Sequence, residues 1–320
     1  MSKGHSDVDG EGRGASRVLI VNPAAGGEAE ADEVLAAVRG EGQDVALRAT
    51  QKAGDARRFA REAATSGAAE LWVAGGDGTL HEAVLGLRDA GELRGTVLHP
   101  VPLGTGNDLI RSVRIPLDWK DAVQALGRSR RTLELDVMEV EVDGEALVAI
   151  NAVVAGNGGR IGEVLDAEGK SWWGPLAYLR AAAEVAMELE SVAVTIRVDD
   201  GPERRQRILN VVAANGRYAG KGIPIAPGAR PDDGTLDVVT MGEATLPHVL
   251  GMMQTLLREE DPDHEAYRHE RVRSMTIEAD ETLPVSVDGE NTEAHTVRIT
   301  LAPERIPVRV PSEEGTEEDG

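Results

Sequence analysis

The sequence predicts an α/β domain followed by an antiparallel β-rich domain. Through about residue 130, short apolar runs alternate with amphipathic segments, which is the pattern of a mostly parallel sheet covered by helices. Beyond that point the runs are short and alternating, and Asp-Gly pairs such as Asp143-Gly144 and Asp288-Gly289 mark turns beside them. The length of 320 residues is enough for two domains, each with its own core.

Four strands are expected in the first half, the first as a buried apolar run and the second as an alternating run, and helical patterns separate them. The strands span 17–21, 44–50, 71–74 and 96–102, and helices are expected around 34–38 and over 55–64, 80–87 and 119–126. Glycine-containing loops follow the first, third and fourth strands. Because parallel sheets bind ligands beyond the carboxyl ends of their strands, these three loops are expected to lie at the ligand-binding edge.

The second half is expected to contain short strands interrupted by two helices. The strands span 132–142, 146–152, 192–198, 207–213, 236–241, 274–278, 284–287 and 296–301. The helices span 174–190 and 246–259. Residues 1–16 are expected to form a disordered tail, and residues 311–320 an acidic tail.

Composition excludes several classes of site and partner. The chain has no cysteine, which excludes disulfides, thiolate metal sites and cysteine nucleophiles. Its formal net charge of -22 repels nucleic acid and anionic lipid headgroups unless a local basic patch overrides it. No apolar run reaches the ~18 residues needed to span a bilayer and no secretory signal is visible, so a cytoplasmic location is expected. Lysine is rare, and the lysines are Lys3, Lys52, Lys120, Lys170 and Lys221.

The most informative motif is Gly75-Gly76-Asp77-Gly78-Thr79, which lies between the third strand and a helix. At a helix N-terminus, backbone N–H groups and the helix dipole favour an anion, and glycines allow a phosphate to approach the backbone closely. Asp77 adds a carboxylate through which a divalent cation can bridge to that phosphate. The alternative is an ordinary turn between a strand and a helix, and the motif alone does not decide between the two.

Two further loops follow strands and carry candidate ligands. Leu103-Gly104-Thr105-Gly106-Asn107-Asp108 is rich in glycine and polar residues, which favours a cradle for phosphate and metal over a purely structural loop. Asn22-Pro23-Ala24-Ala25-Gly26 ends the first strand. Taken alone, this second loop is better explained as a simple turn.

Acidic residues in the second half are the remaining candidates. Asp136 lies in an apolar strand, where a buried carboxylate must be paired or metal-bound, whereas an exposed strand face explains it equally well. The loop with Asp232-Asp233-Gly234 is either an acidic turn or a cation site, and the turn is the simpler interpretation. Glu290 follows the Asp288-Gly289 turn, and it becomes a candidate if other acids converge nearby.

Taken in this order, the motifs resemble those of the diacylglycerol kinase catalytic-domain family. The closest subgroup is the soluble bacterial and archaeal lipid kinases, which are relatives of sphingosine and ceramide kinases. The resemblance runs from about residue 17 to residue 310, and its carriers are 22–26, 50–56, 75–82, 102–108, 151–162, 174–178, 225–237 and 287–290. Any one motif is weak, but the ordered set is highly specific. His81 departs from the family, which usually has Asn there, and is expected to tune nucleotide contacts.

The resemblance implies the architecture in more detail. The N-terminal domain would be an α/β nucleotide-binding domain like those of phosphofructokinases and NAD kinases, comprising residues 17–130 with 303–310. The C-terminal domain would be an antiparallel β-sandwich over residues 131–302 that binds the lipid substrate. ATP would bind in the cleft.

The resemblance also implies roles for individual residues. Nucleotide contacts are implied for Asn22, Pro23, Ala24, Ala25, Gly26, Thr50, Gly75, Gly76, Asp77, Gly78, Thr79, Leu80, His81, Glu82, Gly104, Thr105 and Asn107. The implied metal ligands are Asp77, Asp108 and Asp136 for a catalytic Mg²⁺, and Asp233 with main-chain oxygens of Arg230 and Thr235 for a structural Mg²⁺. Glu290 is the implied proton acceptor, although some relatives give that role to the aspartate of the glycine motif, here Asp77.

The implied function is an ATP-dependent lipid kinase that transfers the γ-phosphoryl group to the hydroxyl of a lipid alcohol. Diacylglycerol is the default substrate, while an ether lipid, an isoprenoid alcohol or a glycolipid suits the same chemistry. Two alternatives stay open: a small-molecule kinase like NAD kinase or phosphofructokinase, and a non-catalytic regulator that binds nucleotide or lipid. The acidic surface predicts weak, transient, salt-dependent contact with the inner face of the membrane, and homodimer formation stays open.

Overall fold

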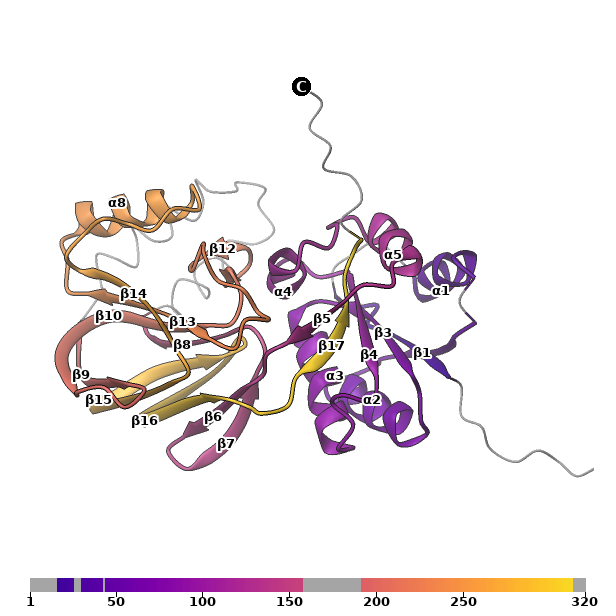
Figure 1. The fold of residues 1–320 in the computed structure, drawn as a ribbon, viewed down its shortest axis with the longest axis horizontal. Helices are drawn as coiled ribbons and strands as arrows, with labels where there is room; N and C mark the ends of the chain where they lie inside the picture. Colours follow the sequence, from indigo (N-terminus) through magenta and orange to yellow (C-terminus); the bar gives the residue numbers. More distant parts are fainter. Residues whose placement is uncertain (1–15, 26–29, 43, 158–190, 313–320) are drawn as a thin grey trace, which may run out of the picture.

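The computed structural model describes residues 16–25, 30–42, 44–157 and 191–312, which form two domains lying side by side (Figure 1). The N-terminal domain contains a mostly parallel sheet with helices, and the C-terminal domain contains an antiparallel sheet. The last strand of the chain returns to the first domain. The predicted fold class is confirmed.

Within the described residues, the first sheet has six strands, and all but the last are parallel. In spatial order they are β2 (Ala46–Ala49), β1 (Arg17–Val21), β3 (Glu70–Gly75), β4 (Val97–Pro102), β17 (Ile306–Arg309) and β5 (Thr132–Leu135). The register aligns Val21 with both Ala49 and Ala74. The loops after β1, β2 and β3 therefore leave the sheet at the same edge.

Helices cover both faces of this sheet. They are α1 (Ala31–Gly40), α2 (Asp55–Thr65), α3 (Asp77–Asp89), α4 (Asp108–Ser112) and α5 (Trp119–Arg128). Helix α2 packs against α3 and α1 packs against α5, and the two pairs lie on opposite faces (Figure 1). Because the strands are covered on both faces, side chains such as Leu19, Trp72 and Leu98 are fully buried. This explains why the inner strands β1 and β3 are continuous apolar runs, while the edge strands β2 and β5 are partly exposed.

The second sheet is antiparallel and has nine strands in the part of the chain that the structure describes. Their order is β14 (Tyr267–Val272), β13 (Leu236–Gly242), β10 (Arg204–Ala214), β8 (Ala152–Gly156), β15 (Ser274–Val287), β16 (Glu290–Leu301), β6 (Met138–Val142) and β7 (Glu145–Ala149), with β9 (Val192–Val198) paired to β10 and β15. A separate two-stranded hairpin consists of β11 (Tyr218–Ala219) and β12 (Ile223–Pro224).

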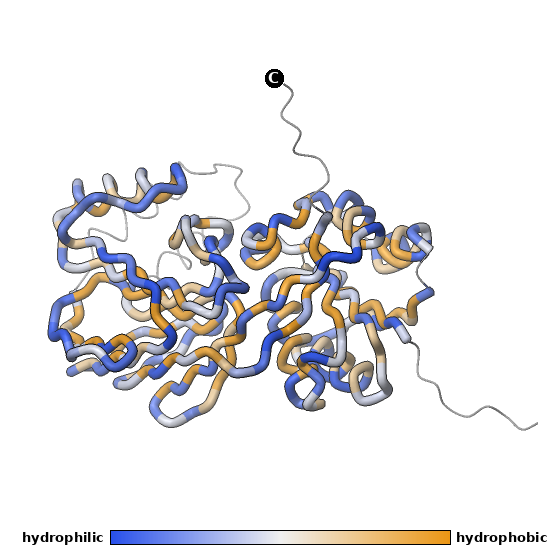
Figure 2. Tube along the Cα trace, viewed as in Figure 1, coloured by the Kyte–Doolittle hydropathy of each residue, from blue (hydrophilic) through white to orange (hydrophobic). Residues whose placement is uncertain are grey.

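The described residues of the second domain form two apolar cores. Residues such as Val211, Ile277 and Val297 form one core, contributed by several strands of the sheet. The other core joins the sheet to helix α8 (Leu246–Leu256), where Met252 and Leu256 are buried. Figure 2 shows hydrophobic residues following the strands of both domains, while loops and outer helix faces are largely hydrophilic.

The structure differs from the sequence predictions at several elements. The run 132–142, predicted as one strand, is split: β5 belongs to the first sheet and β6 to the second, so the chain crosses between the domains at Asp136 and Val137. The predicted strands 274–278 and 284–287 form one long strand, β15, with an irregular register between Glu278 and Leu283. Strand β14 was not predicted, because charged residues dominate this edge strand and only Val272 is buried.

Several predictions concern residues outside the described ranges. They are the helix 174–190, Gly26, the motif segment 174–178 and most of both predicted tails. Among the described residues, no helix combines the length and the apolar character needed to span a membrane.

Candidate active site

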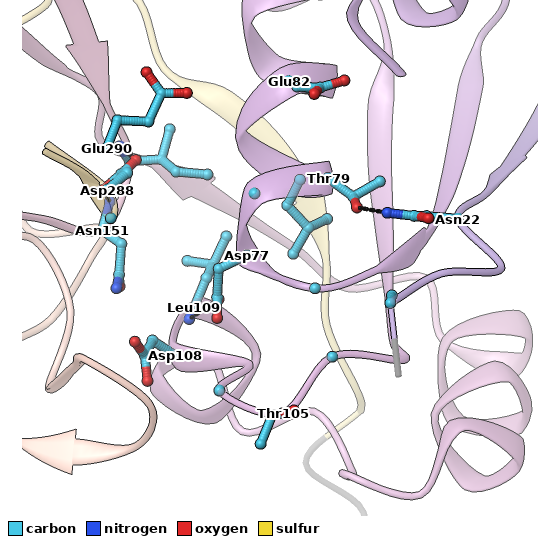
Figure 3. A pocket seen from close by; sticks show the side chains of 18 of the residues that line it. Asn22, Asp77, Thr79, Glu82, Thr105, Asp108, Leu109, Asn151, Asp288 and Glu290 are labelled. Carbon is cyan, nitrogen blue, oxygen red and sulfur yellow. Dashed lines mark hydrogen bonds between the residues drawn. The ribbon is translucent and has the colours of Figure 1, made fainter. Parts of the chain in front are cut away.

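A cavity of about 760 Å³ lies between the two domains (Figure 3). The first domain lines it with the loops that follow β1, β2, β3 and β4 and with the start of α3. The second domain lines it with residues 150–152, the tip of the β11–β12 hairpin and the turn between β15 and β16. The glycine loops predicted to lie at one edge of the sheet therefore share this cavity.

Most of the predicted site residues line the cavity. They are Asn22, Ala24, Ala25, Thr50, Gly76, Asp77, Gly78, Thr79, Leu80, Glu82, Gly104, Thr105, Asp108 and Glu290. The predicted residues that do not line it are Pro23, Gly75, His81, Asn107, Asp136, Arg230, Asp233 and Thr235. The cavity thus contains residues from both domains. Of the three predicted ligands of the catalytic Mg²⁺, Asp77 and Asp108 line it and Asp136 does not.

The two glycine loops are in direct backbone contact. A β-carbon added to Gly104 would lie 2.5 Å from the Cα atom of Gly76, which is closer than real β-carbons approach a backbone. A β-carbon on Gly106 would lie 2.8 Å from Oδ2 of Asp77. Glycine is therefore required at position 104 for the loops after β3 and β4 to pack together, whereas a β-carbon at position 106 would displace the carboxylate of Asp77. This packing brings Asp77 next to Asp108.

Hydrogen bonds connect the other predicted nucleotide loops to helix α3. Asn22, after β1, donates from Nδ2 to Oγ1 of Thr79 over 2.9 Å (Figure 3). Glu82, one turn further along α3, accepts from the backbone N–H groups of Gly54 and Ala56 over 2.9 and 3.2 Å. Helix α3 therefore fixes the loops after β1 and β2, whereas its own first residues face the cavity.

Half-buried Asp77 and buried Asp108 place a pair of carboxylates in the cavity lining. Burial raises the pKa of Asp77 to about 6, and the nearby charge of Asp108 contributes to this shift. Burial also raises the pKa of Asp108, which is only 5 % exposed. The backbone N–H of Lys221 donates to Asp108 over 3.1 Å, and the N–H of Gly222 also donates to it. Two neighbouring carboxylates in a partly dry site favour a cation between them.

The donor set of this pair fits Mg²⁺. Mg²⁺ prefers oxygen ligands and usually takes one or two protein carboxylates, with water and substrate phosphate completing its octahedron. Asp77 and Asp108 supply two such carboxylates beside the glycine loops. The described residues contain no group of three or more His, Cys, Asp or Glu side chains placed to hold a metal. A Mg²⁺ here would therefore depend on water and on phosphate oxygens.

Asp136 does not join this pair, contrary to the sequence prediction. Its carboxylate lies 2.7 Å from Nε of Arg305 and accepts from the N–H of Gly234 over 2.7 Å. The reason is the split of the predicted strand, which places Asp136 at the crossing between the sheets and away from the carboxyl edge of the first one. Its buried charge is compensated by an arginine.

The loop predicted to hold a structural Mg²⁺ is occupied by side-chain contacts. Asp233 accepts from the N–H and the hydroxyl of Thr235 over 3.0 and 2.6 Å, and from Arg271 over 2.8 Å. The guanidinium of Arg230 pairs with Asp232. The carboxylate of Asp233 is therefore held by Thr235 and Arg271, and the structural Mg²⁺ at this loop stays a prediction.

His81 faces the second domain. Its ring is 5 % exposed, and Nε2 lies 2.9 Å from the backbone oxygen of Val148, at the end of β7. The ring therefore forms a hydrogen bond between the two domains. His81 was expected to contact the nucleotide, but it does not line the cavity. Asn107 also lies behind the lining, where its φ of 54° and its hydrogen bond to the oxygen of Gly104 shape the loop.

The turn between β15 and β16 carries the predicted proton acceptor. Glu290 is exposed and lines the cavity from the second domain (Figure 3). Two residues before it, Asp288 accepts from the N–H groups of Ile150, Asn151 and Ala152 over 2.7, 3.0 and 2.9 Å. Asp288 thus fixes the turn with Glu290 to the chain segment that forms the adjacent cavity wall.

Sequence reasoning missed part of the site. Asp288 was interpreted only as a turn residue, and neither Lys52 nor Lys221 was assigned a role, although all three line the cavity. The signal available in the sequence was the rarity of lysine, since two of the five lysines line one cavity.

Comparison with known proteins identifies the two domains. Residues 16–140 match the family model of the diacylglycerol kinase catalytic domain. Residues 151–310 match the model of the YegS C-terminal NAD kinase beta sandwich-like domain. A probable YegS-like lipid kinase from Pseudomonas aeruginosa is 32 % identical over 296 residues, covering 92 % of this chain and 94 % of that protein.

Solved structures show the same fold over nearly the whole chain. A putative diacylglycerol kinase from Bacillus anthracis is 26 % identical with a TM-score of 0.75, covering 92 % of this chain and 97 % of that one. An NAD kinase from Archaeoglobus fulgidus, solved with ATP, has a TM-score of 0.52 at 12 % identity, covering 93 % of this chain and 94 % of that one, which shows a shared fold alone. The chain belongs to the diacylglycerol kinase catalytic-domain family, in its branch of YegS-like lipid kinases.

Proposed function

We propose that the protein is an ATP-dependent kinase that phosphorylates the hydroxyl group of a lipid alcohol, with diacylglycerol as the first candidate. The observation that carries this proposal is the shared cavity, which is lined by four strand-end loops of one domain, with Asp77 and Asp108, and by Glu290 of the other domain. Family membership supports phosphoryl transfer to a lipid, because relatives that match this chain are named as probable lipid kinases.

The first domain would bind the nucleotide. Gly76 is the N-cap of α3, a helix of 13 residues, so the backbone N–H groups of Asp77, Gly78 and Thr79 lie at its N-terminus. These groups and the helix dipole favour the phosphates of ATP. Mg²⁺ at Asp77 and Asp108 would neutralise charge on the phosphate oxygens. The loops with Asn22 and Thr50 would contact the rest of the nucleotide.

The second domain would present the lipid. Ile150, Ala152 and Val154 line the cavity near Glu290 and offer apolar surface beside a carboxylate. This combination suits an alcohol attached to an acyl or alkyl chain better than a fully polar acceptor. It is the feature that favours a lipid over NAD or a sugar phosphate.

The proposed transfer involves one bond formed and one broken. The lipid hydroxyl oxygen forms a bond to the γ-phosphorus, and the bond from that phosphorus to the β,γ-bridging oxygen breaks, so ADP leaves. The hydroxyl proton goes to a carboxylate, for which both Glu290 and Asp77 are candidates. A base at this position contributes about 10²–10⁴-fold, while most of the rate comes from positioning and charge neutralisation.

A lipid-extract assay tests the proposal. The purified chain is incubated with γ-³²P-labelled ATP, Mg²⁺ and a total lipid extract, and the products are separated by thin-layer chromatography. We expect label in the organic phase, at the mobility of a phosphorylated lipid. Label on NAD or a sugar would instead support the small-molecule kinase, and ATP binding without transfer to any acceptor would support a regulator.

A further inference from the structure

The tip of the β11–β12 hairpin has an unusual backbone. Gly220, Lys221 and Gly222 have φ angles of +70°, +72° and +87°, so three successive residues are in the left-handed region. Glycine adopts this region freely, but a lysine there is disfavoured by about 1 kcal/mol through the clash of its β-carbon with the backbone. A non-glycine residue held in such a conformation at the edge of a cavity is a candidate for a functional role.

Hydrogen bonds hold this tip against the carboxylate pair. The N–H groups of Lys221 and Gly222 both donate to Asp108. A β-carbon on Gly106 would lie 3.3 Å from the Cα atom of Lys221 and 2.8 Å from Oδ2 of Asp77. The backbone of Lys221 is therefore fixed over the loop after β4, beside Asp77 and Asp108. The proposed function puts the transferred phosphoryl group at these two carboxylates.

The charges of the cavity require cations for a nucleotide to bind. The charged residues that line it are Asp77, Glu82, Asp108, Asp288, Glu290, Lys52 and Lys221. Carboxylates dominate this set, and ATP adds about four further negative charges, so each lysine has a large effect on phosphate binding. Lys52 lies on the loop before α2. Lys221 interacts electrostatically with Asp108, at the carboxylate pair.

We propose that Lys221 binds the terminal phosphate of the nucleotide through its ammonium group, from the second domain. The inference rests on the proposed function, because it assumes that ATP phosphates enter at Asp77 and Asp108. Lys221 would add a cation from the second domain to the Mg²⁺ held by the first. The unfavourable backbone conformation is retained because glycine, which suits the turn better, carries no charge.

The substitution Lys221→Gly separates the backbone from the charge. Glycine relieves the conformational cost, so the thermal stability of the variant should be equal to or higher than that of the wild type. Loss of the ammonium group should weaken the binding of Mg²⁺-ATP about tenfold in calorimetric titration, since one charge-assisted hydrogen bond is worth roughly that factor. Binding of adenosine, which has no phosphate, should not change.

Three further variants sharpen the test. Lys221→Met keeps the length of the side chain without its charge and should lose the same affinity, whereas Lys221→Arg should retain most of it. Arg114→Gly is the matched control, because Arg114 is an exposed cation with a φ of +58° that does not line the cavity. It should bind ATP like the wild type.

The outcomes distinguish the two proposals. If the wild type binds and turns over ATP, and both Lys221→Gly and Lys221→Met bind it equally well, the role of Lys221 is refuted while the kinase proposal stands. If the variants lost affinity for adenosine as well as for ATP, the cavity would be generally distorted, and the role of Lys221 in phosphate binding would also be refuted. If the wild type binds no ATP at all, both proposals fail.

Discussion

Gly76 and Gly104 lie back to back, so that a β-carbon on Gly104 would be 2.5 Å from the Cα atom of Gly76. This contact joins the loop after β3 to the loop after β4, and these are the loops that carry Asp77 and Asp108. The arrangement of the carboxylate pair thus depends on two residues without side chains. Close packing of backbone on backbone leaves no flexible atom that could move aside.

The substitution Gly104→Ala should therefore separate the two loops. We expect a loss of about 1–3 kcal/mol in the free energy of unfolding, the usual cost of inserting a methyl group into a packed site, together with a loss of most kinase activity. Urea unfolding and phosphorylation assays measure both effects. Gly251→Ala in α8 is the control, since no atom lies within 4 Å of an added β-carbon there, and it should be neutral or stabilising. Wild-type stability and activity in Gly104→Ala would contradict the structure at this contact.

The proposed proton acceptors can be compared by isosteric substitution. Glu290→Gln and Asp77→Asn should each lose most kinase activity while unfolding at temperatures close to that of the wild type, because shape is preserved and only the charge is removed. Glu293→Gln, at an exposed position on β16 outside the cavity lining, should keep full activity. The rate constant of phosphorylation in single-turnover experiments measures the effect. Near-normal turnover in either cavity variant would remove that carboxylate from the mechanism.

Metal dependence should distinguish Asp108 from Asp136. Asp108→Asn removes one of the two carboxylates proposed for Mg²⁺, so the Mg²⁺ concentration that half-saturates phosphorylation should rise about tenfold or more. Asp136→Asn should leave this concentration unchanged, because Asp136 pairs with Arg305 and does not line the cavity. It should instead lower the free energy of unfolding by about 1–3 kcal/mol, since the buried partner groups lose a charged acceptor. If Asp136→Asn also raised the Mg²⁺ concentration required, the sequence prediction that Asp136 binds Mg²⁺ together with Asp77 and Asp108 would be supported.

His99 should make stability fall in mild acid. Its ring is 3 % exposed and stacks on Trp72, and burial lowers its pKa to about 3, with Arg309 and Arg17 also opposing its protonation. Glu70 lies 3.8 Å from the ring, but it is already paired with Arg17 over 2.9 Å. The unfolded chain gains a proton at this histidine below a pH of about 6.5, whereas the folded protein gains it only near pH 3.

The contribution of His99 is therefore complete above about pH 6.5 and decreases as the pH falls toward 3. The slope should be about 1.4 kcal/mol per pH unit within this window. His99→Gln lacks this titration, so the difference in the free energy of unfolding between wild type and variant should itself change with this slope in urea unfolding at pH 7, 6, 5 and 4. If wild type and His99→Gln lost stability in parallel as the pH falls, His99 would not be buried in its neutral form.

The pairing of Asp77 with Asp108 could be predicted from sequence, and the place of Asp136 could not. Asp77 and Asp108 follow parallel strands, β3 and β4, that are neighbours in the sheet, so the carboxyl-end rule brings their loops together. Asp136 lies in a run with uniform alternation, and nothing local marks the crossing from one sheet to the other. Its partner Arg305 lies far along the chain, and contacts over such distances leave no trace in a local pattern.

Two residues of the site, Asp288 and Lys221, could not be recognised from the sequence because they lie in ordinary turn patterns. An Asp-Gly pair predicts a turn correctly at Asp288, but it does not predict which backbone groups the carboxylate will reach. Lys221 lies between glycines at the tip of a short hairpin, whose approach to Asp108 depends on the packing of the two domains. Local sequence determines the backbone at both positions, whereas their roles arise from the assembled cavity.

The insertion of β17 between β4 and β5 has a consequence during synthesis on the ribosome. Residues 306–309 complete the first sheet, yet they are translated only after the entire second domain has emerged. Until then β4 is an open edge, which invites pairing with foreign strands. The amino-terminal half therefore lacks one strand of its sheet until the second domain has been synthesised, and β4 is open to incorrect pairing during that time.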